Sequence, residues 1–160
     1  MRVTIGVVSD THLHRVTGAL QGIYDLYLSD KDLILHAGDV VCAEVLEFLR
    51  RKDFHGVHGN MDPPEVRELV PAKKVIEIGP YRIGLIHGSG PASGLEDRIL
   101  PQFQGVDAIV YGHSHQPVCH RKGGLFLFNP GTATGYSASG RHTVGILELG
   151  EEIRGEIVML

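Results

Sequence analysis

The sequence predicts an α/β fold in which two mixed sheets pack face to face with helices outside. In the first half, short apolar runs alternate with helical patterns, which is typical of βα crossovers and a largely parallel sheet. In the second half, paired strand patterns flank glycine-containing turns, which indicates antiparallel hairpins. A third observation concerns function, because polar side chains recur where the predicted strands end.

The first half predicts strands over residues 2–8, 33–35 and 54–57. Helical spacing separates them, over 17–28 and 44–50. A third, short helix begins at Pro63 and Pro64 and ends near Leu69. Since these units resemble successive βα crossovers, we expect the loops after the strands to share one edge of the sheet.

The second half predicts three strand pairs, over 74–78 with 81–88, 118–122 with 125–129, and 142–149 with 152–160. The first turn contains Gly79 and Pro80, and the second contains Gly123 and Gly124. A helix over 95–103, disturbed at its end by Pro101, and a buried strand over 108–111 lie between the first two pairs. A loop rich in glycine and serine covers 131–140.

The composition predicts one domain over residues 1–160, without repeats. A formal charge of −4, from 15 basic and 19 acidic residues, argues against stable nucleic-acid binding, so nucleic acid remains only as a cleaved substrate. Cys42 and Cys119 have no metal-binding or disulfide spacing, so we expect a reduced cytoplasm. The N-terminal run reads as a strand rather than a signal peptide, and no apolar stretch is long enough for a membrane, so we expect a soluble protein.

Seven polar side chains follow predicted strands, in the segments SDTH, HAGD, HGNMD, LIHG and YGHSH. They are Asp10, His12, Asp39, Asn60, His87, His113 and His115. Four ligands for each of two ions, with one carboxylate shared, require seven side chains. Imidazole with carboxylate and amide oxygen suits Mn, Fe, Ni or Zn better than Ca or Mg. The pattern therefore predicts two transition-metal ions.

The spacing within these segments supports joint ligation. A two-residue step on an extended segment would point Asp10 and His12 to the same side, and the same holds for His113 and His115. Three neighbouring glycines either let the backbone approach the ions closely or adopt positive φ, or they are ordinary turn residues: Gly38, Gly59 and Gly112.

The remaining histidines have structural interpretations. We expect five of them to be surface or loop residues: His14, His55, His58, His120 and His142. For His36, a hydrogen bond that steadies the site and simple packing are both open interpretations.

The ordered motifs resemble the calcineurin-like metallophosphoesterase superfamily, whose pattern runs D-x-H, G-D, G-N-H-[DE], H and G-H-x-H. The resemblance extends from SDTH at residue 9 to NPGT at residue 129 and is greatest to the small single-domain phosphodiesterases of bacteria and archaea. These share their fold with the scaffold subunit of the eukaryotic retromer. The resemblance implies a four-layer sandwich of helix, sheet, sheet and helix.

The resemblance also implies the role of each ligand. Asp10, His12 and His115 would hold the first ion, Asn60, His87 and His113 the second, and Asp39 would bridge them. In such a site a water shared by two metals about 3.5–4 Å apart becomes the hydroxide nucleophile. Asn60 would help orient the phosphate, and no covalent intermediate forms. Manganese is the first expectation for the metal, with iron, nickel and zinc as alternatives.

One position departs from the family pattern. Met61 stands where the larger family has a histidine, and a thioether cannot protonate a leaving alkoxide. General acid catalysis typically contributes roughly 10²- to 10⁴-fold. His14 is a candidate substitute, and Asp62 is expected only to cap the turn into Pro63.

The loop over 129–141 has two interpretations. It could close over the site and offer Arg141 to a phosphate, but we favour a surface loop without substrate contact.

The leading functional hypothesis is a metal-dependent phosphoesterase acting on a small-molecule or nucleotide phosphoester. A phosphodiester is preferred to a monoester because two cations can hold a diester without groups dedicated to a dianion. The alternative is a catalytically weak protein-binding scaffold of the same fold, which Met61 supports. A mononuclear metal sensor would leave Asn60 and His87 unexplained. A homo-oligomer is compatible with the sequence.

Overall fold

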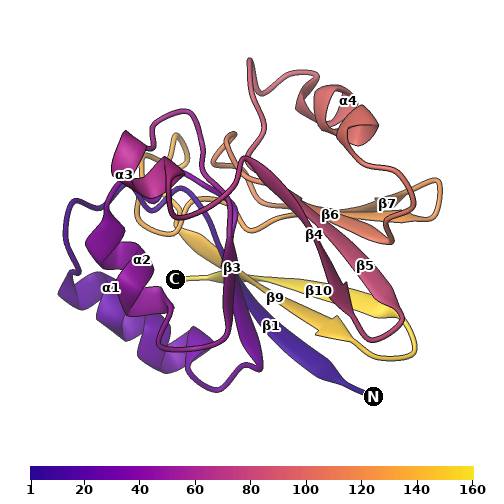
Figure 1. Cartoon of the computed structure of the whole chain (residues 1–160), viewed down its shortest axis with the longest axis horizontal. Coiled ribbons are helices and arrows are strands. Elements are labelled where there is room, and N and C mark those ends of the chain that lie inside the picture. The colour runs from indigo at the N-terminus through magenta and orange to yellow at the C-terminus, as the bar shows by residue number, and fades with distance from the viewer.

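Two five-stranded sheets form the centre of this computed structural model, which describes residues 1–160 (Figure 1). The strand orders are β10-β9-β1-β2-β3 and β4-β5-β6-β8-β7. Helices cover the outer faces, with α1 and α2 on the first sheet and α4 on the second. The predicted sandwich of two mixed sheets flanked by helices is confirmed.

The first sheet contains strands from both ends of the chain: β1 Val3–Val8, β2 Leu33–His36, β3 Phe54–Gly56, β9 Thr143–Leu149 and β10 Ile153–Met159. The three N-terminal strands are parallel, as expected. The C-terminal hairpin adds to their edge, where β9 runs antiparallel to β1. Gly6 of the central strand therefore lies opposite both Ile34 and Ile146.

The second sheet joins two hairpins: β4 Lys73–Ile78, β5 Tyr81–Ile86, β6 Ala108–Val110, β7 Val118–Lys122 and β8 Leu125–Asn129. β4 with β5 and β7 with β8 are antiparallel, as the turn signals predict. β6 lies between the hairpins and is parallel to β5 and β8. This sheet is therefore also mixed.

The helices are short: α1 Gly18–Ile23, α2 Ala43–Leu49, α3 Pro64–Arg67 and α4 Leu95–Ile99. α1 continues as a π-helical turn, η1 Tyr24–Leu28, so the helix predicted over 17–28 is confirmed but its second half is wider than expected. α4 continues as a 3₁₀ turn, η2 Leu100–Gln102, at Pro101, whose missing N–H cannot extend an α-helical ladder. None of these helices has the length and apolar character needed to cross a bilayer.

The core has three apolar clusters. The largest lies between the sheets and includes Ile5, Leu35, Leu85, Val110 and Phe128, all without exposed surface. A second cluster packs α1 and α2 on the first sheet, and a third packs α4 on the second. Burial on both faces fixes the strands, so the loops after them start from well-defined positions.

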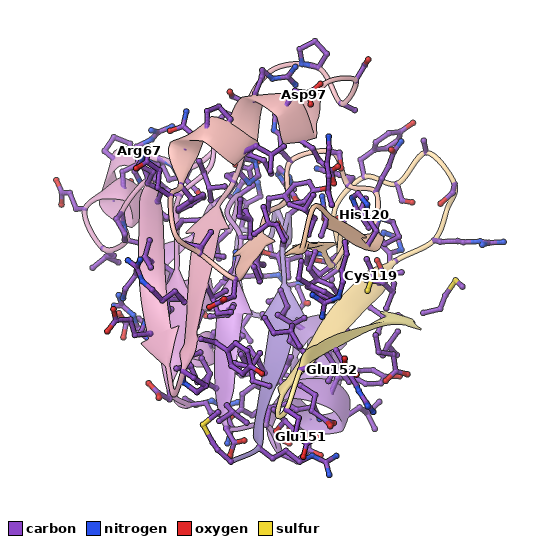
Figure 2. The ribbon with its side chains drawn as sticks, turned by 90° about the vertical axis from the view of Figure 1, so that its right-hand side faces the viewer. Arg67, Asp97, Cys119, His120, Glu151 and Glu152 are labelled. Atoms are coloured by element: carbon purple, nitrogen blue, oxygen red, sulfur yellow. The ribbon has the colours of Figure 1, made fainter.

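The labelled residues in Figure 2 mark the two ends of the molecule. Arg67 of α3 and Asp97 of α4 lie at one end, and Glu151 and Glu152 of the β9–β10 turn lie at the opposite end. The predicted ligand residues come after β1, β2, β3, β5 and β6. In parallel strands these ends share one edge, where ligands commonly bind.

Candidate metal centre

All seven predicted ligand side chains lie together. Asp10 and His12 follow β1, Asp39 follows β2, Asn60 follows β3, His87 follows β5, and His113 and His115 follow β6. The two sheets face each other, so the loops of one sheet meet the loops of the other. Residues separated by roughly a hundred positions along the chain are therefore neighbours.

A first group surrounds the carboxylate of Asp10. Its Oδ1 lies 3.7 Å from His12 Nε2 and 3.3 Å from His115 Nε2. Two atoms bonded to one divalent ion at about 2.0–2.2 Å lie roughly 3.0–3.5 Å apart. These three side chains could thus hold one metal ion with little movement.

A second group surrounds His87 Nε2. Asp39 Oδ2 lies 3.1 Å from this nitrogen, Asn60 Oδ1 3.2 Å, and His113 Nδ1 3.3 Å. The same distance argument applies, so these four atoms suit a second ion.

Asp39 lies between the two groups. Its Oδ2 is 3.6 Å from His12 Nε2 of the first group as well as 3.1 Å from His87 Nε2. Its other oxygen, Oδ1, accepts the backbone N–H of Met61 at 2.9 Å. This is the position that a bridging carboxylate requires. Asp10 Oδ1 also lies 3.8 Å from His87, so the two groups are close enough to interact electrostatically.

Two atoms of the first group are buried without a hydrogen-bond partner, Asp10 Oδ1 and His12 Nε2. Buried polar atoms are almost always paired, because an unpaired one loses its hydration without compensation. These two atoms face one another. A cation between them would satisfy both, so the donor set fits a metal ion.

Backbone carbonyls orient three of the imidazoles. In each, one ring nitrogen lies within hydrogen-bond distance of a carbonyl oxygen: His87 Nδ1 to Ala37, His113 Nε2 to Gly90, and His115 Nδ1 to Tyr136. A carbonyl only accepts, so that nitrogen carries the proton and the opposite nitrogen keeps its lone pair. The opposite nitrogens of His87 and His115 face carboxylates, and that of His113 faces His87 Nε2, so each points into the centre as metal-binding histidines require.

The ligand loops have an unusual backbone. Six residues other than glycine have positive φ, and five are predicted ligands: Asp10 (53°), His12 (48°), Asp39 (60°), His113 (73°) and His115 (62°), with Val41 (61°) the sixth. Asp10 and His12, like His113 and His115, are thus not on extended segments, and the argument from an extended two-residue step was wrong. Left-handed residues cost about 1–3 kcal/mol each and cluster at functional sites.

Glycines allow the ligand loops to approach one another closely. A Cβ at Gly112 would lie 2.1 Å from Ser9 Oγ and 2.8 Å from Asp10 Oδ2. Gly38 has a φ of 103°, and a Cβ there would meet the ring of His87. At these glycines the backbone lies close to the predicted ligand side chains, and its approach to the ions stays a prediction.

Asp62 has a larger role than its predicted cap. The cap of α3 has no side-chain hydrogen bond, so that prediction was wrong. The buried Asp62 carboxylate instead accepts the backbone N–H groups of Asp39 at 2.9 Å, Val41 at 2.7 Å and Gly59 at 2.7 Å. One side chain thereby ties the loop after β2 to the loop after β3.

His36 also joins two ligand loops. Its Nδ1 accepts the N–H of Gly38 at 3.0 Å, so Nε2 carries the proton and donates to Thr11 Oγ1 at 3.1 Å. Burial lowers the pKa of His36 to about 4, which keeps the imidazole neutral. Of its two interpretations, the steadying hydrogen bond is confirmed.

The carboxylates and imidazoles shift one another's pKa values. Burial alone would raise the pKa of Asp10, but the neighbouring imidazoles of His115 and His12 hold it well below its usual range. Burial opposes the shift at His87 too, yet the nearby Asp39 carboxylate raises its pKa. The pKa of His115 is raised chiefly by the Asp10 carboxylate beside it. The centre therefore has strong negative potential, which favours bound cations.

Two cavities open beside the centre. One, of about 630 Å³, is bordered by His113, His115 and the 136–141 part of the Gly/Ser-rich loop. The other, of about 310 Å³, is bordered by Asn60 and His87. Substrate groups can thus reach both ligand groups. The loop also orients a ligand, because the Tyr136 carbonyl accepts from His115.

The position of the missing family histidine is solvent-facing. Met61 is 59% exposed, and its contact with the centre is the backbone N–H bond to Asp39. His14 is exposed, and its carbonyl accepts from Cys42 Sγ. The other four histidines expected to be structural bind partners outside the ligand groups: Lys74, Val70, Glu96 and Gly135.

The family model described as the calcineurin-like phosphoesterase superfamily domain matches residues 3–152. The chain belongs to this superfamily. A probable metallophosphoesterase of Methanocaldococcus jannaschii is 38% identical over 137 residues, which cover 81% of this chain and 68% of that protein. Membership and the clustered ligands support metal-dependent phosphoester hydrolysis.

Solved structures share the superfamily fold. A structure described as a novel archaeal phosphodiesterase has a TM-score of 0.78 at 24% identity, covering 98% of this chain and 99% of that one. Vacuolar protein sorting 29 from Cryptosporidium parvum has a TM-score of 0.77 at 23% identity, covering 99% and 97%. At these identities the likeness concerns the fold.

Sequence reasoning missed several residues that support the superfamily site. Ser9 Oγ donates to Asp10 Oδ2 at 2.7 Å, and Thr132 Oγ1 donates to the Asp10 carbonyl at 2.8 Å. Arg67 donates to the carbonyls of Gly59 and Asp62. The adjacency of Ser9 to a ligand was a usable signal. For Thr132 and Arg67 the sequence contains no such signal, because only the fold brings them to the ligand loops.

Proposed function

We propose that the chain hydrolyses phosphodiesters with two bound divalent transition-metal ions. Manganese is the first expectation, with iron, nickel and zinc as alternatives. One observation carries the proposal: the buried, unpartnered atoms Asp10 Oδ1 and His12 Nε2 lie among nitrogen and oxygen atoms with ligand spacing.

The proposed roles follow from which atoms are free. Bound cations would supply positive charge for the phosphoryl oxygens and acidify water, so that hydroxide exists near neutral pH. Asp39 would hold both halves of the centre together through Oδ2, while Met61 N–H fixes Oδ1. Asn60 directs Oδ1 at His87, which leaves its exposed amide group to donate to a phosphate oxygen.

Position 61 supports a preference among substrates. With no imidazole there, the leaving alkoxide must depart with little protonation, so esters of acidic alcohols and phenols should react faster. A diester also needs fewer cationic side chains than a dianionic monoester. These two arguments favour diesters with good leaving groups.

An assay of metal-stripped protein with each metal restored in turn tests the proposal. The panel contains p-nitrophenyl phosphate, bis(p-nitrophenyl) phosphate and cyclic nucleotides. We expect turnover only after metal addition and the largest kcat/KM on a diester. Equal turnover without metal, or faster hydrolysis of the monoester, would overturn the proposal.

A protein-binding scaffold remains the second candidate, favoured by the exposed Met61 and by the shared fold of a vacuolar protein sorting protein. The same assay distinguishes a phosphodiesterase from a protein-binding scaffold. A protein that binds metal stoichiometrically but hydrolyses no phosphoester would support the scaffold.

A further inference from the structure

The cavity beside His113 and His115 has a chemistry unlike that of the metal centre. Its volume of about 630 Å³ lies within the usual range for small-molecule sites. Apolar side chains of Ile157 and Met159 line one part, and Ser137, Ser139 and Arg141 line another. No carboxylate borders it, so Arg141 is its one fixed charge.

Arg141 is available to a ligand. Its backbone N–H binds Ser139 Oγ at 3.2 Å, whereas its guanidinium makes no hydrogen bond or ion pair. An unpaired guanidinium presents a planar set of donors that matches the oxygens of a phosphate. Arg141 lines the same cavity as His113 and His115.

Tyr136 provides an aromatic surface on the same loop. Its side chain is 77% exposed, although its carbonyl is fixed by His115. Exposed aromatic rings beside a phosphate site stack readily on nucleobases. The apolar Ile157 and Met159 extend this surface.

The wall that carries both residues is held against the metal centre. Thr132 and Thr134 donate side-chain hydrogen bonds to the carbonyls of Asp10 and Thr11. At the other end, the His142 ring binds the Gly135 carbonyl at 2.8 Å. The segment that carries Tyr136 and Arg141 is therefore anchored at both of its ends, beside the metal centre.

We propose that this cavity binds the nucleoside of a phosphodiester that carries a second phosphate, with the base on Tyr136 and the second phosphate on Arg141. The proposal rests on the proposed phosphodiesterase function and adds its substrate class, a phosphorylated nucleotide ester. It also revises the favoured interpretation of the 129–141 loop, which would contact substrate.

Two substrates that differ only in the second phosphate test the role of Arg141. Thymidine 5′-(p-nitrophenyl phosphate) and its 3′-phosphorylated derivative have the same scissile bond. In both, water adds to phosphorus and p-nitrophenolate departs. The measured quantity is the ratio of their kcat/KM values, in which any general loss of activity cancels. We expect Arg141→Gln to lower the preference for the 3′-phosphorylated ester about tenfold, with Arg141→Lys intermediate.

Arg154→Gln is the matched control, because Arg154 pairs with Glu152, which lies at the end of the molecule opposite α3 and α4 (Figure 2). This variant should keep the wild-type ratio. An unchanged ratio in Arg141→Gln, with or without lower rates on both esters, would overturn the subsite. If wild-type protein hydrolyses neither ester with any metal, the proposed function fails instead.

Tyr136→Ala tests the base contact against methyl p-nitrophenyl phosphate, which has the same leaving group and no nucleoside. The preference for the thymidine ester should fall about fivefold or more. Binding of the product thymidine 3′,5′-bisphosphate, measured by competition against thymidine 5′-phosphate, gives a readout independent of turnover. The bisphosphate should bind more tightly than thymidine 5′-phosphate to the wild-type protein and no more tightly to Arg141→Gln. A difference in affinity that persists in Arg141→Gln would contradict the proposal.

Discussion

Asp10 Oδ1 and His12 Nε2 lie 3.7 Å apart in the interior, and neither atom has a hydrogen-bond partner. The other oxygen of the same carboxylate, Asp10 Oδ2, accepts hydrogen bonds from Ser9 Oγ and from the backbone N–H of His113. The protein thus holds a carboxylate and an imidazole in place, each with one atom unsatisfied.

Asp39→Ala should remove activity and most bound metal, because Asp39 faces ligand atoms of both groups. Metal content after dialysis and kcat on bis(p-nitrophenyl) phosphate are the measurements. His120→Ala is a suitable control, since this histidine binds Glu96 on the outer side of the second sheet. Full activity of Asp39→Ala would contradict a bridging role.

Met61→His should raise turnover on alkyl phosphodiesters more than on nitrophenyl esters, because an alkoxide needs protonation and a nitrophenolate does not. The exposed position accepts an imidazole without repacking. Comparing the change in kcat for the two ester types shows whether position 61 acts on the leaving group. Equal gains would mean that position 61 does not act through the leaving group. His14→Ala, assayed beside it, tests whether His14 already donates a proton.

Raising the pH from 6 to 8 should increase the stabilisation by bound metal. The pKa values of His87 and His115 are raised in the metal-free fold, so their contribution to stability is full below about 6.5 and is lost as pH rises through the folded pKa. The lowered pKa of His36 acts in the opposite direction, because its contribution to stability is full above about 6.5 and falls as the pH drops from there to about 4. Protons also compete less with metal at high pH.

The measurement is Tm with and without manganese at pH 6, 7 and 8. The increase in Tm caused by manganese should become larger as the pH rises. A difference that stays constant or shrinks would show that these imidazoles do not exchange protons for metal.

Asp62→Ala should lower the free energy of unfolding by about 3 kcal/mol or more, because three backbone N–H groups, two buried and one part-buried, lose a charged acceptor. For a chain of this length that corresponds to a Tm decrease of roughly 6–12 °C. Asp62→Asn keeps one acceptor oxygen and should be intermediate. Metal affinity should fall as well, because the Asp39 and Asn60 loops separate.

Asp97→Ala serves as the control for Asp62→Ala. Asp97 is exposed on α4 and forms only a surface pair with Lys122 at 3.6 Å (Figure 2). Such pairs contribute about 0–1 kcal/mol. If both variants lost the same small stability, Asp62 would not be the link between the two loops.

Local patterns predicted the elements but not all their partners. Turn chemistry at Gly79 and Gly123 identified the hairpins β4–β5 and β7–β8. The return of β9 to the edge of β1 had no local signal, because strand pairing across more than a hundred residues depends on which edge remains open. The same limit explains why Asp62 was taken for a helix cap. Its three partners are fixed by how the loops pack, not by its neighbours.

The sequence alone determined the kinds of ligands, their order and the superfamily, because strand ends and short motifs are local properties. The tertiary structure decided their geometry. It set the left-handed backbone at Asp10 and His12, the ring nitrogen that each imidazole presents, and the cavity between His115 and Arg141. These depend on contacts between loops from two different sheets, and such contacts exist only when the whole core has formed.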